Sequence, residues 1–290
     1  MSNVGIDEAT HLKHQQMLCR ILEEFDRVCK VLAIPYTLFS GTLLGAVRHQ
    51  GFIPWDDDVD IVMLREDYER FLREAETVLD QQKFYLQKEF SEHWPMFFSK
   101  LRMNGTTCLE KFHPKDPLIH QGIYIDIFPC DNAAETYPGR LVQFLASKVV
   151  IAKCLYARSY DTDSRLKQLF ISVCRCLPMA PFLRLVRKEQ KAGKMVHSFF
   201  GGASAFSKNV YPRAYFEQRT EADFEGKSYP ISQYYDKLLH TLYGDYMQIP
   251  AEEDRERKQH AILLDFENSY EKYQHYRDDM RFDVYTRSIR

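Results

Sequence analysis

The chain has 290 residues and a mass of 34.3 kDa, 45% of its residues are hydrophobic, and its formal net charge is −2. A chain of this size can bury a large core without disulfide or metal staples, and its near-neutral charge argues against a general nucleic-acid binder. The seven cysteines form no zinc-binding pattern, so we interpret them as reduced thiols.

The first residues, MSNVGIDEATHLKHQQ, are too polar for a signal peptide, and no apolar run is long enough to cross a bilayer. We therefore expect a cytoplasmic protein, with peripheral contact to the cytoplasmic face of a membrane as an alternative. The first predicted element is an amphipathic helix over residues 7–32. Its apolar residues recur at helical spacing: Leu18, Ile21, Leu22, Phe25, Val28 and Leu32.

A strand over residues 36–39 and a short helix, LLGAVRH, are predicted next. Between them, Ser40, Gly41 and Thr42 can turn the chain and cap the helix. A glycine at such a turn lets backbone N–H groups approach an anion, and a helix N-terminus favours negative charge. These three residues are therefore candidates for binding the phosphates of a donor, with an ordinary helix cap as the alternative.

The stretch GFIPWDDDVDIVM has four aspartates within five positions, at the start of a predicted strand over residues 59–64. Residues two apart in a strand point to the same side, with about 7 Å between their Cα atoms at about 3.3 Å per residue. Asp58 and Asp60 can thus share one Mg²⁺, which prefers carboxylate oxygens. The overlapping pair Asp56 and Asp58 is an alternative, and so is a solvated turn without metal. We favour Asp58 and Asp60 because the strand that follows Asp60 sets its direction.

An amphipathic helix over residues 68–79 and two strands, FYLQKEF and FFSKLRM, are predicted before a turn at Asn104 and Gly105. The next predicted strand is GIYIDIFP, residues 122–129, in which Asp126 is a lone acid opposite an isoleucine face. If this strand lies beside VDIVML, then Asp126, Asp58 and Asp60 converge on one Mg²⁺ or Mn²⁺. Pairing of Asp126 with an arginine is the alternative.

Three cations near these elements are candidates for neutralising phosphate charge: Arg48, Lys100 and Arg102. Each is alternatively a surface salt-bridge partner.

Residues 138–200 are predicted to be helical, with a break at LPMAP. Between Arg140 and Phe200 there are 12 Lys or Arg and 3 Asp or Glu, a local charge of +9, whereas the rest of the chain carries −11. This charge, beside apolar helices, predicts contact with an anionic bilayer through residues 140–200. A packed scaffold or a cradle for an anionic soluble acceptor is the alternative.

Residues 210–230 are interpreted as irregular, and YYDKLLHTLYGDYM as a last helix that ends near Gly244. Strands early in the chain with helices around them predict an α/β (α+β) fold with a mixed sheet. We expect one catalytic domain over residues 1–290. It would comprise a sheet core (1–135) that holds the acids, a basic helical insertion (136–210), and a C-terminal helix with a charged tail (211–290).

The segment SGTLLGAVRHQGFIPWDDDVDIVMLREDYERF closely resembles the signature of the LicD family, which is related to the fukutin proteins. The resemblance continues in KLRMNGTT, QGIYIDIFPCD, FEGKSYPIS and LYGDYMQIPAEEDR. It implies a nucleotidyltransferase-type fold, metal-binding roles for Asp58 and Asp60, and site roles for Asp126, Gly41 and Thr42. A histidine usual in the closing segment is displaced here to His260, so either a site role or a plain surface position fits it.

The same resemblance implies a function: metal-dependent transfer of a phosphocholine-like group from a CDP-alcohol donor to a sugar hydroxyl. The acceptor would be a cell-surface glycan or a lipid-linked glycan, such as lipopolysaccharide, teichoic acid or capsule. One rival is a nucleotidyltransferase that moves NMP onto an acceptor and releases pyrophosphate instead of CMP. Another is a non-catalytic protein that binds a glycan or a membrane.

Overall fold

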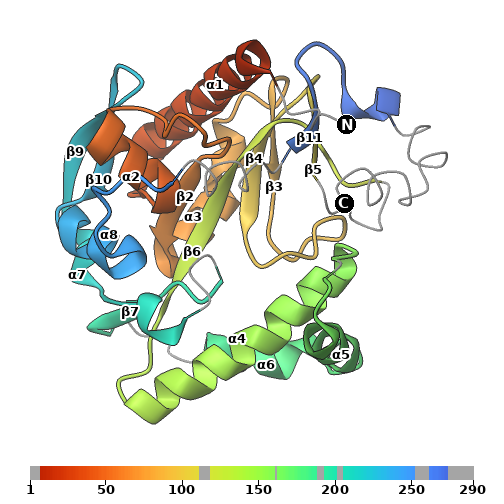
Figure 1. Ribbon diagram of the computed structural model, residues 1–290, viewed down its shortest axis with the longest axis vertical. Helices are drawn as coiled ribbons and strands as arrows, with labels where there is room; N and C mark the ends of the chain where they lie inside the picture. The colour runs from red at the N-terminus through yellow and green to blue at the C-terminus, as the bar shows by residue number, and fades with distance from the viewer. Residues whose placement is uncertain are drawn as a thin grey trace.

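Helix α1 (Glu8–Leu32) begins the computed structural model, which describes residues 7–110, 118–160, 162–187, 193–200, 205–251 and 261–273 (Figure 1). The Asp7 carboxylate caps α1 by accepting a hydrogen bond from Thr10 N at 2.9 Å. The apolar positions found from helical spacing are the buried ones, including Leu18, Ile21 and Phe25. The predicted first helix is therefore confirmed.

One mixed sheet forms the centre of the molecule (Figure 1). Five of its seven strands, in spatial order, are β1 (Thr37–Leu38), β2 (Asp60–Leu64), β6 (Tyr124–Asn132), β4 (Ser99–Met103) and β3 (Phe84–Gln87). β2 and β6 run parallel, while the other neighbours are antiparallel. Helix α1 packs against β4 and β6. The predicted α/β class with a mixed sheet is confirmed.

Helix α2 (Ser40–His49) follows β1 and contacts β2. The predicted cap from Ser40 to Thr42 is wrong, because Phe39 is the N-cap residue and makes no side-chain capping bond. Ser40 is the first residue of α2, although its φ of 49° lies in the left-handed region. Its hydroxyl forms a hydrogen bond with the Tyr243 hydroxyl at 3.0 Å. The Thr42 hydroxyl accepts a hydrogen bond from Asp60 N at 2.8 Å. Both hydroxyls thus serve contacts beyond the helix.

Gly45 lets α2 lie close to the loop that leads to the acids. A Cβ added at Gly45 would lie 2.4 Å from the Gly51 carbonyl oxygen, which is backbone and cannot rotate away. We expect Gly45→Ala to lower the free energy of unfolding by about 1–3 kcal/mol. Urea denaturation measures this, with Gly193→Ala as the control, since its added Cβ meets one atom, at 3.9 Å. Equal stability of the two variants would contradict the prediction.

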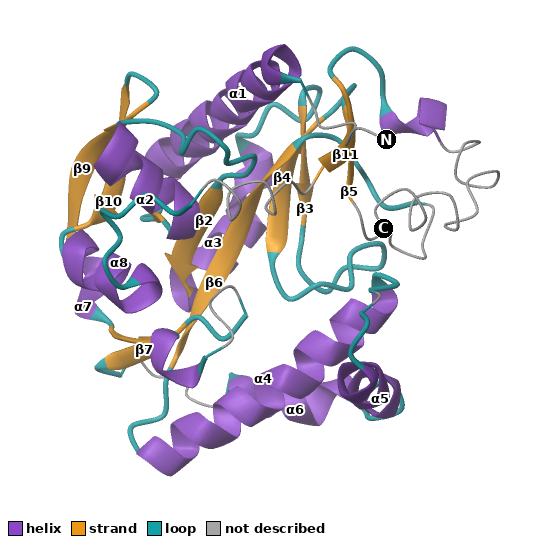
Figure 2. Cartoon of the chain, in the orientation of Figure 1, coloured by secondary structure: helices purple, strands orange, loops and turns teal. Residues whose placement is uncertain are grey.

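The basic segment forms three helices, α4 (Tyr137–Ala157), α5 (Arg165–Cys174) and α6 (Met179–Val186), which Figure 2 shows grouped together below the sheet. The predicted break at LPMAP is confirmed between α5 and α6. The predicted helical extent to residue 200 is wrong. Residues 195–197 form strand β7 (Met195–His197), which pairs with the end of β6, a long-range contact that helical spacing cannot reveal.

The prediction of an irregular segment over residues 210–230 is also wrong. It contains β8 (Val210–Pro212), α7 (Ala214–Glu217), β9 (Arg219–Phe224) and β10 (Lys227–Ser232). A two-residue turn joins β9 to β10, with φ of 51° at Glu225 and 76° at Gly226, as a type I′ hairpin requires. Strand β9 is rich in exposed charge, which hides the apolar alternation used to recognise a strand.

The last predicted helix is confirmed as α8 (Tyr235–Tyr243), followed by Gly244. One further pair was not predicted: β5 (Thr107–Glu110) with β11 (Ala261–Asp265). Short 3-10 turns complete the described elements: η1 (Ala75–Thr77) after α3 (Arg65–Glu74), η2 (Phe206–Lys208) and η4 (Tyr270–Tyr273).

Candidate active site

The two predicted acidic strands lie side by side. β2 and β6 pair in parallel, and Asp60 is the register partner of Asp126. Parallel pairing at this register brings the two residues to the same level of the sheet, although 66 positions separate them in the chain. The predicted adjacency of these strands is confirmed.

The chain before β2 alternates in burial. Asp56, Asp58 and Asp60 are half-buried, whereas Asp57 and Val59 between them are buried. The Asp57 carboxylate lies on the other side, 3.5 Å from the backbone nitrogen of Ala261 in β11. Three of the four aspartates therefore line one side of this segment, so the two overlapping pairs considered from the sequence belong to one cluster.

The clustered acids affect one another's ionisation. Burial, followed by the negative charges of Asp58, Asp126 and Asp56, raises the pKa of Asp60 well above its usual range. A hydrogen bond from the Ser40 hydroxyl acts in the opposite direction. The negative charges of the neighbouring aspartates thus act against the ionised form of Asp60, and a bound cation would relieve this repulsion.

The donor set suits a hard divalent cation, because the clustered side chains offer carboxylate oxygens. Among the residues that the structure describes, no group of three His, Cys, Asp or Glu side chains has the geometry of a complete metal site. Mg²⁺ is commonly held by one or two carboxylates together with substrate phosphates. Asp58 and Asp60 supply two carboxylates, the number that this pattern uses.

A chain of alternating charges leads away from Asp126. Lys100 Nζ in β4 lies 3.1 Å from Asp126 Oδ1 and 3.8 Å from a carboxylate oxygen of Glu110. Arg158, just after α4, lies 3.0 Å from the other Glu110 oxygen. The Tyr124 hydroxyl also donates to Glu110 at 2.9 Å. The basic helical segment is therefore connected to the acidic cluster through three ion pairs, Arg158–Glu110, Glu110–Lys100 and Lys100–Asp126.

Lys100 is 1% exposed and enclosed by aromatic rings. Its ammonium lies 3.1 Å from the Tyr124 ring centroid, 5.4 Å from that of Trp94 and 5.5 Å from that of Phe98. Burial lowers the pKa of Lys100, although the charges of Asp126 and Glu110 act against this shift. Sequence reasoning proposed Lys100 as a phosphate ligand, and the structure places its ammonium directly on Asp126.

We expect Lys100→Met to lower kcat by about 10- to 100-fold with little change in the KM for the donor, because it removes the cation that positions Asp126. Steady-state kinetics measure both quantities. Lys30→Met is the control, since Lys30 forms an exposed ion pair with Asp26 at 2.7 Å. A raised donor KM at unchanged kcat would instead identify Lys100 as a phosphate ligand.

The start of α2 also borders the acids. A Cβ added at Gly41 would lie 2.7 Å from Asp56 Oδ2, so this glycine lets a carboxylate approach the helix closely. Thr42 binds the backbone of Asp60, and Ser40 bonds to Tyr243 of α8. Sequence reasoning did not select Tyr243. The one sequence feature that could have indicated a site role for Tyr243 is its place in LYGDYMQIPAEEDR, a segment that is part of the family resemblance.

The two predicted arginines are bound within the protein. Arg48 donates to the carbonyl oxygen of Tyr246 at 2.6 Å and to His49 at 3.0 Å. Arg102 is 1% exposed and donates to Gln87 at 2.7 Å and to the Gly122 carbonyl at 2.8 Å. His260 lies outside the described residues.

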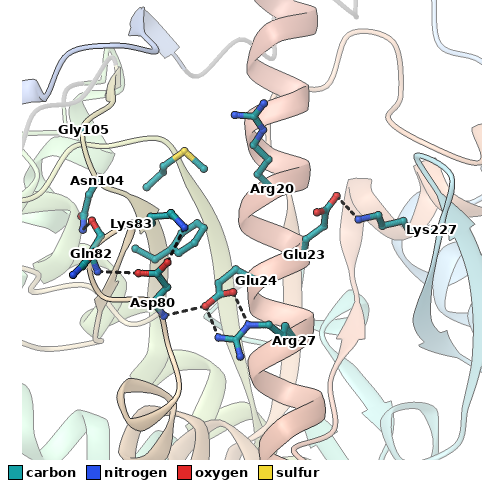
Figure 3. A pocket seen from close by; sticks show the side chains of 12 residues that line it. Arg20, Glu23, Glu24, Arg27, Asp80, Gln82, Lys83, Asn104, Gly105 and Lys227 are labelled. Atoms are coloured by element: carbon teal, nitrogen blue, oxygen red, sulfur yellow. Dashed lines mark hydrogen bonds and ion pairs between the residues drawn. The ribbon is translucent and has the colours of Figure 1, made fainter.

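A separate hollow of about 740 Å³ lies along α1, beside the residues that flank β3 and β4 (Figure 3). Its charged residues largely pair with one another, as in Arg27 with Glu24 at 2.7 Å, Lys83 with Asp80 at 3.0 Å, and Lys227 with Glu23 at 2.7 Å. None of the clustered aspartates lines it. The candidate active site is therefore assigned to the carboxylates and not to this hollow.

Known proteins match the chain across this site. Residues 33–145 match the family described as LicD/FKTN/FKRP, nucleotidyltransferase domain. The chain is 28% identical over 282 residues to the lipopolysaccharide cholinephosphotransferase LicD of Haemophilus influenzae, which covers 87% of this chain and 96% of that protein. It is also 37% identical over 116 residues to an uncharacterized protein of Rickettsia typhi, covering 38% of this chain and 34% of that protein. The matched region contains the paired strands β2 and β6, and these findings show that the chain is a LicD-like phosphotransferase.

Proposed function

We propose that the protein transfers a phosphocholine-like group from a CDP-alcohol to a sugar hydroxyl of a cell-surface glycan, with Mg²⁺ or Mn²⁺ as cofactor. The main support for this proposal is the register pairing of Asp60 with Asp126. Asp56 and Asp58 lie on the same side as Asp60. The printed name of the Haemophilus relative supports phosphocholine as the group and lipopolysaccharide as the kind of acceptor.

In the proposed reaction, the acceptor oxygen forms a bond to the phosphorus that carries the alcohol. The bond from that phosphorus to the bridging oxygen breaks, and the oxygen leaves with CMP. Asp126 accepts the hydroxyl proton, a role we assign because Lys100 already holds its Oδ1. Bound Mg²⁺ would supply neutralisation of the diphosphate charge, and Asp58 and Asp60 would hold it.

The start of α2 is the proposed place for the donor phosphates. Gly41 allows close approach there, and a helix N-terminus of this length favours an anion. In the described structure Asp56 lies against this point, so the donor would arrive together with its cation. Transfer of this kind depends on positioning and charge stabilisation, so no nucleophilic Cys or Ser is required.

A second candidate is transfer of NMP onto the acceptor, which the description of the matched family as a nucleotidyltransferase domain favours. The same carboxylates serve either reaction, but the products differ. Phospho-alcohol transfer releases CMP, whereas nucleotidyl transfer releases pyrophosphate.

We expect CDP-choline to stabilise the protein only when Mg²⁺ is present, by about 2.7 kcal/mol at a ligand concentration of 100 times Kd. Thermal unfolding should be measured with CDP-choline, CDP-ethanolamine, CDP-glycerol, ATP and CTP, each with Mg²⁺ and with chelator. Parallel reactions with a truncated lipopolysaccharide acceptor should be analysed for CMP and pyrophosphate. Stabilisation by ATP or CTP with pyrophosphate release, and none by any CDP-alcohol, would support the second candidate instead.

A further inference from the structure

Helix α5 carries an apolar face that no described part of the chain covers. Leu166 is 81% exposed, Leu169 62%, Phe170 45% and Val173 56%. At 100° per residue these four side chains occupy one arc of about 100°, the width of the stripe by which a helix normally faces a core. On α5 this stripe faces away from the core.

The outward direction of this face is set by contacts on the other side of α5. Ile171 and Cys174 are buried with Ala152 of α4 in a small cluster of their own. Lys153 of α4 donates to the carbonyl oxygens of Arg175 at 2.8 Å and Leu177 at 2.5 Å, at the C-terminal end of α5. Figure 1 shows α5 beyond α4, on the side away from the sheet. These contacts hold α5 with its apolar stripe exposed.

Basic residues surround the stripe. On the helical wheel, Arg165 and Lys167 fall on opposite flanks of the apolar arc, and both are exposed. Over residues 162–187 there are five Lys or Arg and one Asp or Glu. An apolar stripe between basic flanks is the pattern of a helix that lies in the interface of an anionic bilayer.

Within the described ranges, no individual helix has the length and hydropathy to cross a bilayer. Helices α5 and α6 meet that requirement as a pair, and the chain bends by 103° between them.

We propose that the exposed face of α5, formed by Leu166, Leu169, Phe170 and Val173, docks the protein onto an anionic lipid bilayer. Charge selects this occupant over a second copy of the chain. Two copies packed through α5 would bring their basic flanks together, whereas anionic headgroups complement them.

The docking face also lies near the candidate active site. Arg158 contacts Glu110 beside Lys100, and α5 begins seven residues later, a reach of at most roughly 25 Å. Bilayer contact at α5 would therefore hold Arg158, at the end of the ion-pair chain that leads to Asp126, within roughly 25 Å of the docked helix. A glycan acceptor attached to a lipid could then reach the cluster without leaving its bilayer. The docking proposal itself is independent of which group the enzyme transfers.

Co-sedimentation with vesicles of phosphatidylglycerol or phosphatidylcholine, at low and high salt, tests this proposal on the full chain. We expect the protein to bind phosphatidylglycerol vesicles and to bind phosphatidylcholine at least tenfold more weakly, with affinity falling as salt rises. The double variant Leu169→Glu/Phe170→Glu should lose at least tenfold in affinity. The matched control is Leu12→Glu/Val31→Glu, which replaces two apolar residues of α1 that are 56% and 59% exposed.

Both variants change exposed side chains, so their thermal unfolding should match that of the wild type, and activity on a water-soluble acceptor should persist. Failure of the wild type to bind either kind of vesicle would overturn the proposal, as would equal binding by the α5 and α1 variants. Sedimentation velocity identifies the rival occupant. If the wild type dimerises but does not bind vesicles, and Leu169→Glu/Phe170→Glu abolishes the dimer, the α5 face would be assigned to a second copy of the chain.

Discussion

Asp60→Asn is expected to lower the turnover of a CDP-alcohol on the order of a thousandfold, and Asp58→Asn to have an effect of similar size. Each substitution removes a carboxylate from the cluster that we propose holds the metal and the donor diphosphate. Steady-state assays of CMP release over a range of Mg²⁺ concentrations measure the loss. In the wild-type protein, chelator should abolish activity and added Mg²⁺ should restore it.

The fold of the Asp60→Asn variant should gain stability when metal is absent. Burial and the charges of Asp58, Asp126 and Asp56 raise the pKa of Asp60, so its ionised form costs stability above the ordinary carboxyl pKa of about 4. This cost grows as pH rises toward the folded-state pKa, and asparagine removes it. Urea denaturation at pH 7 with chelator should therefore give a higher midpoint for Asp60→Asn than for the wild type.

Asp57→Asn is the matched control for this prediction. Asp57 adjoins Asp58 in sequence, but its carboxylate lies toward β11 instead of the cluster. We expect its activity to stay within about tenfold of the wild type. Full activity of Asp60→Asn, or an equally large loss in Asp57→Asn, would contradict the assignment of the site.

Arg65→Met is expected to lower the free energy of unfolding by about 3–5 kcal/mol, because it breaks a buried ion-pair network. Arg65 begins α3, directly after β2, and donates to Asp131 of β6 at 2.7 and 3.0 Å. It also donates to Glu89 at 2.8 Å, and Arg187 after α6 donates to the same Glu89 oxygen. Without Arg65, two carboxylates stay buried with less compensating charge.

The pair of Arg65 with Asp131 makes part of this stability dependent on pH. Burial by itself raises the pKa of Asp131, but the charge and hydrogen bonds of Arg65 outweigh that effect and lower it below its usual value. The stabilisation is therefore present above pH 4 and is lost as pH falls through the lowered pKa. In Arg65→Met this acid-sensitive part of the stability should disappear.

Urea denaturation of Arg65→Met and Arg70→Met makes the comparison within one helix. Arg70 forms an exposed pair with Glu74 at 3.1 Å and donates to the Leu32 carbonyl oxygen at 2.8 Å, so its loss should cost about 1–2 kcal/mol, less than the loss of Arg65. Further replacement of Asp131 by Leu in the Arg65→Met background should recover part of the lost stability, since it removes one uncompensated buried charge. Equal stabilities of the two single variants would show that the buried network contributes little.

Local patterns in the sequence were enough to find the carboxylates. The turn residues before Asp58, the alternation along β2 and the lone acid in β6 are short-range signals, and they located Asp58, Asp60 and Asp126. The same signals failed where charge masks alternation, as in β9, and where a short strand forms through a distant partner, as in β7. Segments of this kind are stabilised by pairing and not by their own propensity.

The sequence by itself determined which side chains can carry the chemistry, because strand and helix periods place neighbouring residues on one face. Only the tertiary structure decided which of these faces meet. The register of β2 against β6 brings Asp60 beside Asp126, and the antiparallel partner β4 delivers Lys100 to Asp126. It also decided that the apolar stripe of α5 faces outward, since contacts with α4 set that helix's rotation. Such choices depend on packing between residues far apart in the chain, which no local pattern encodes.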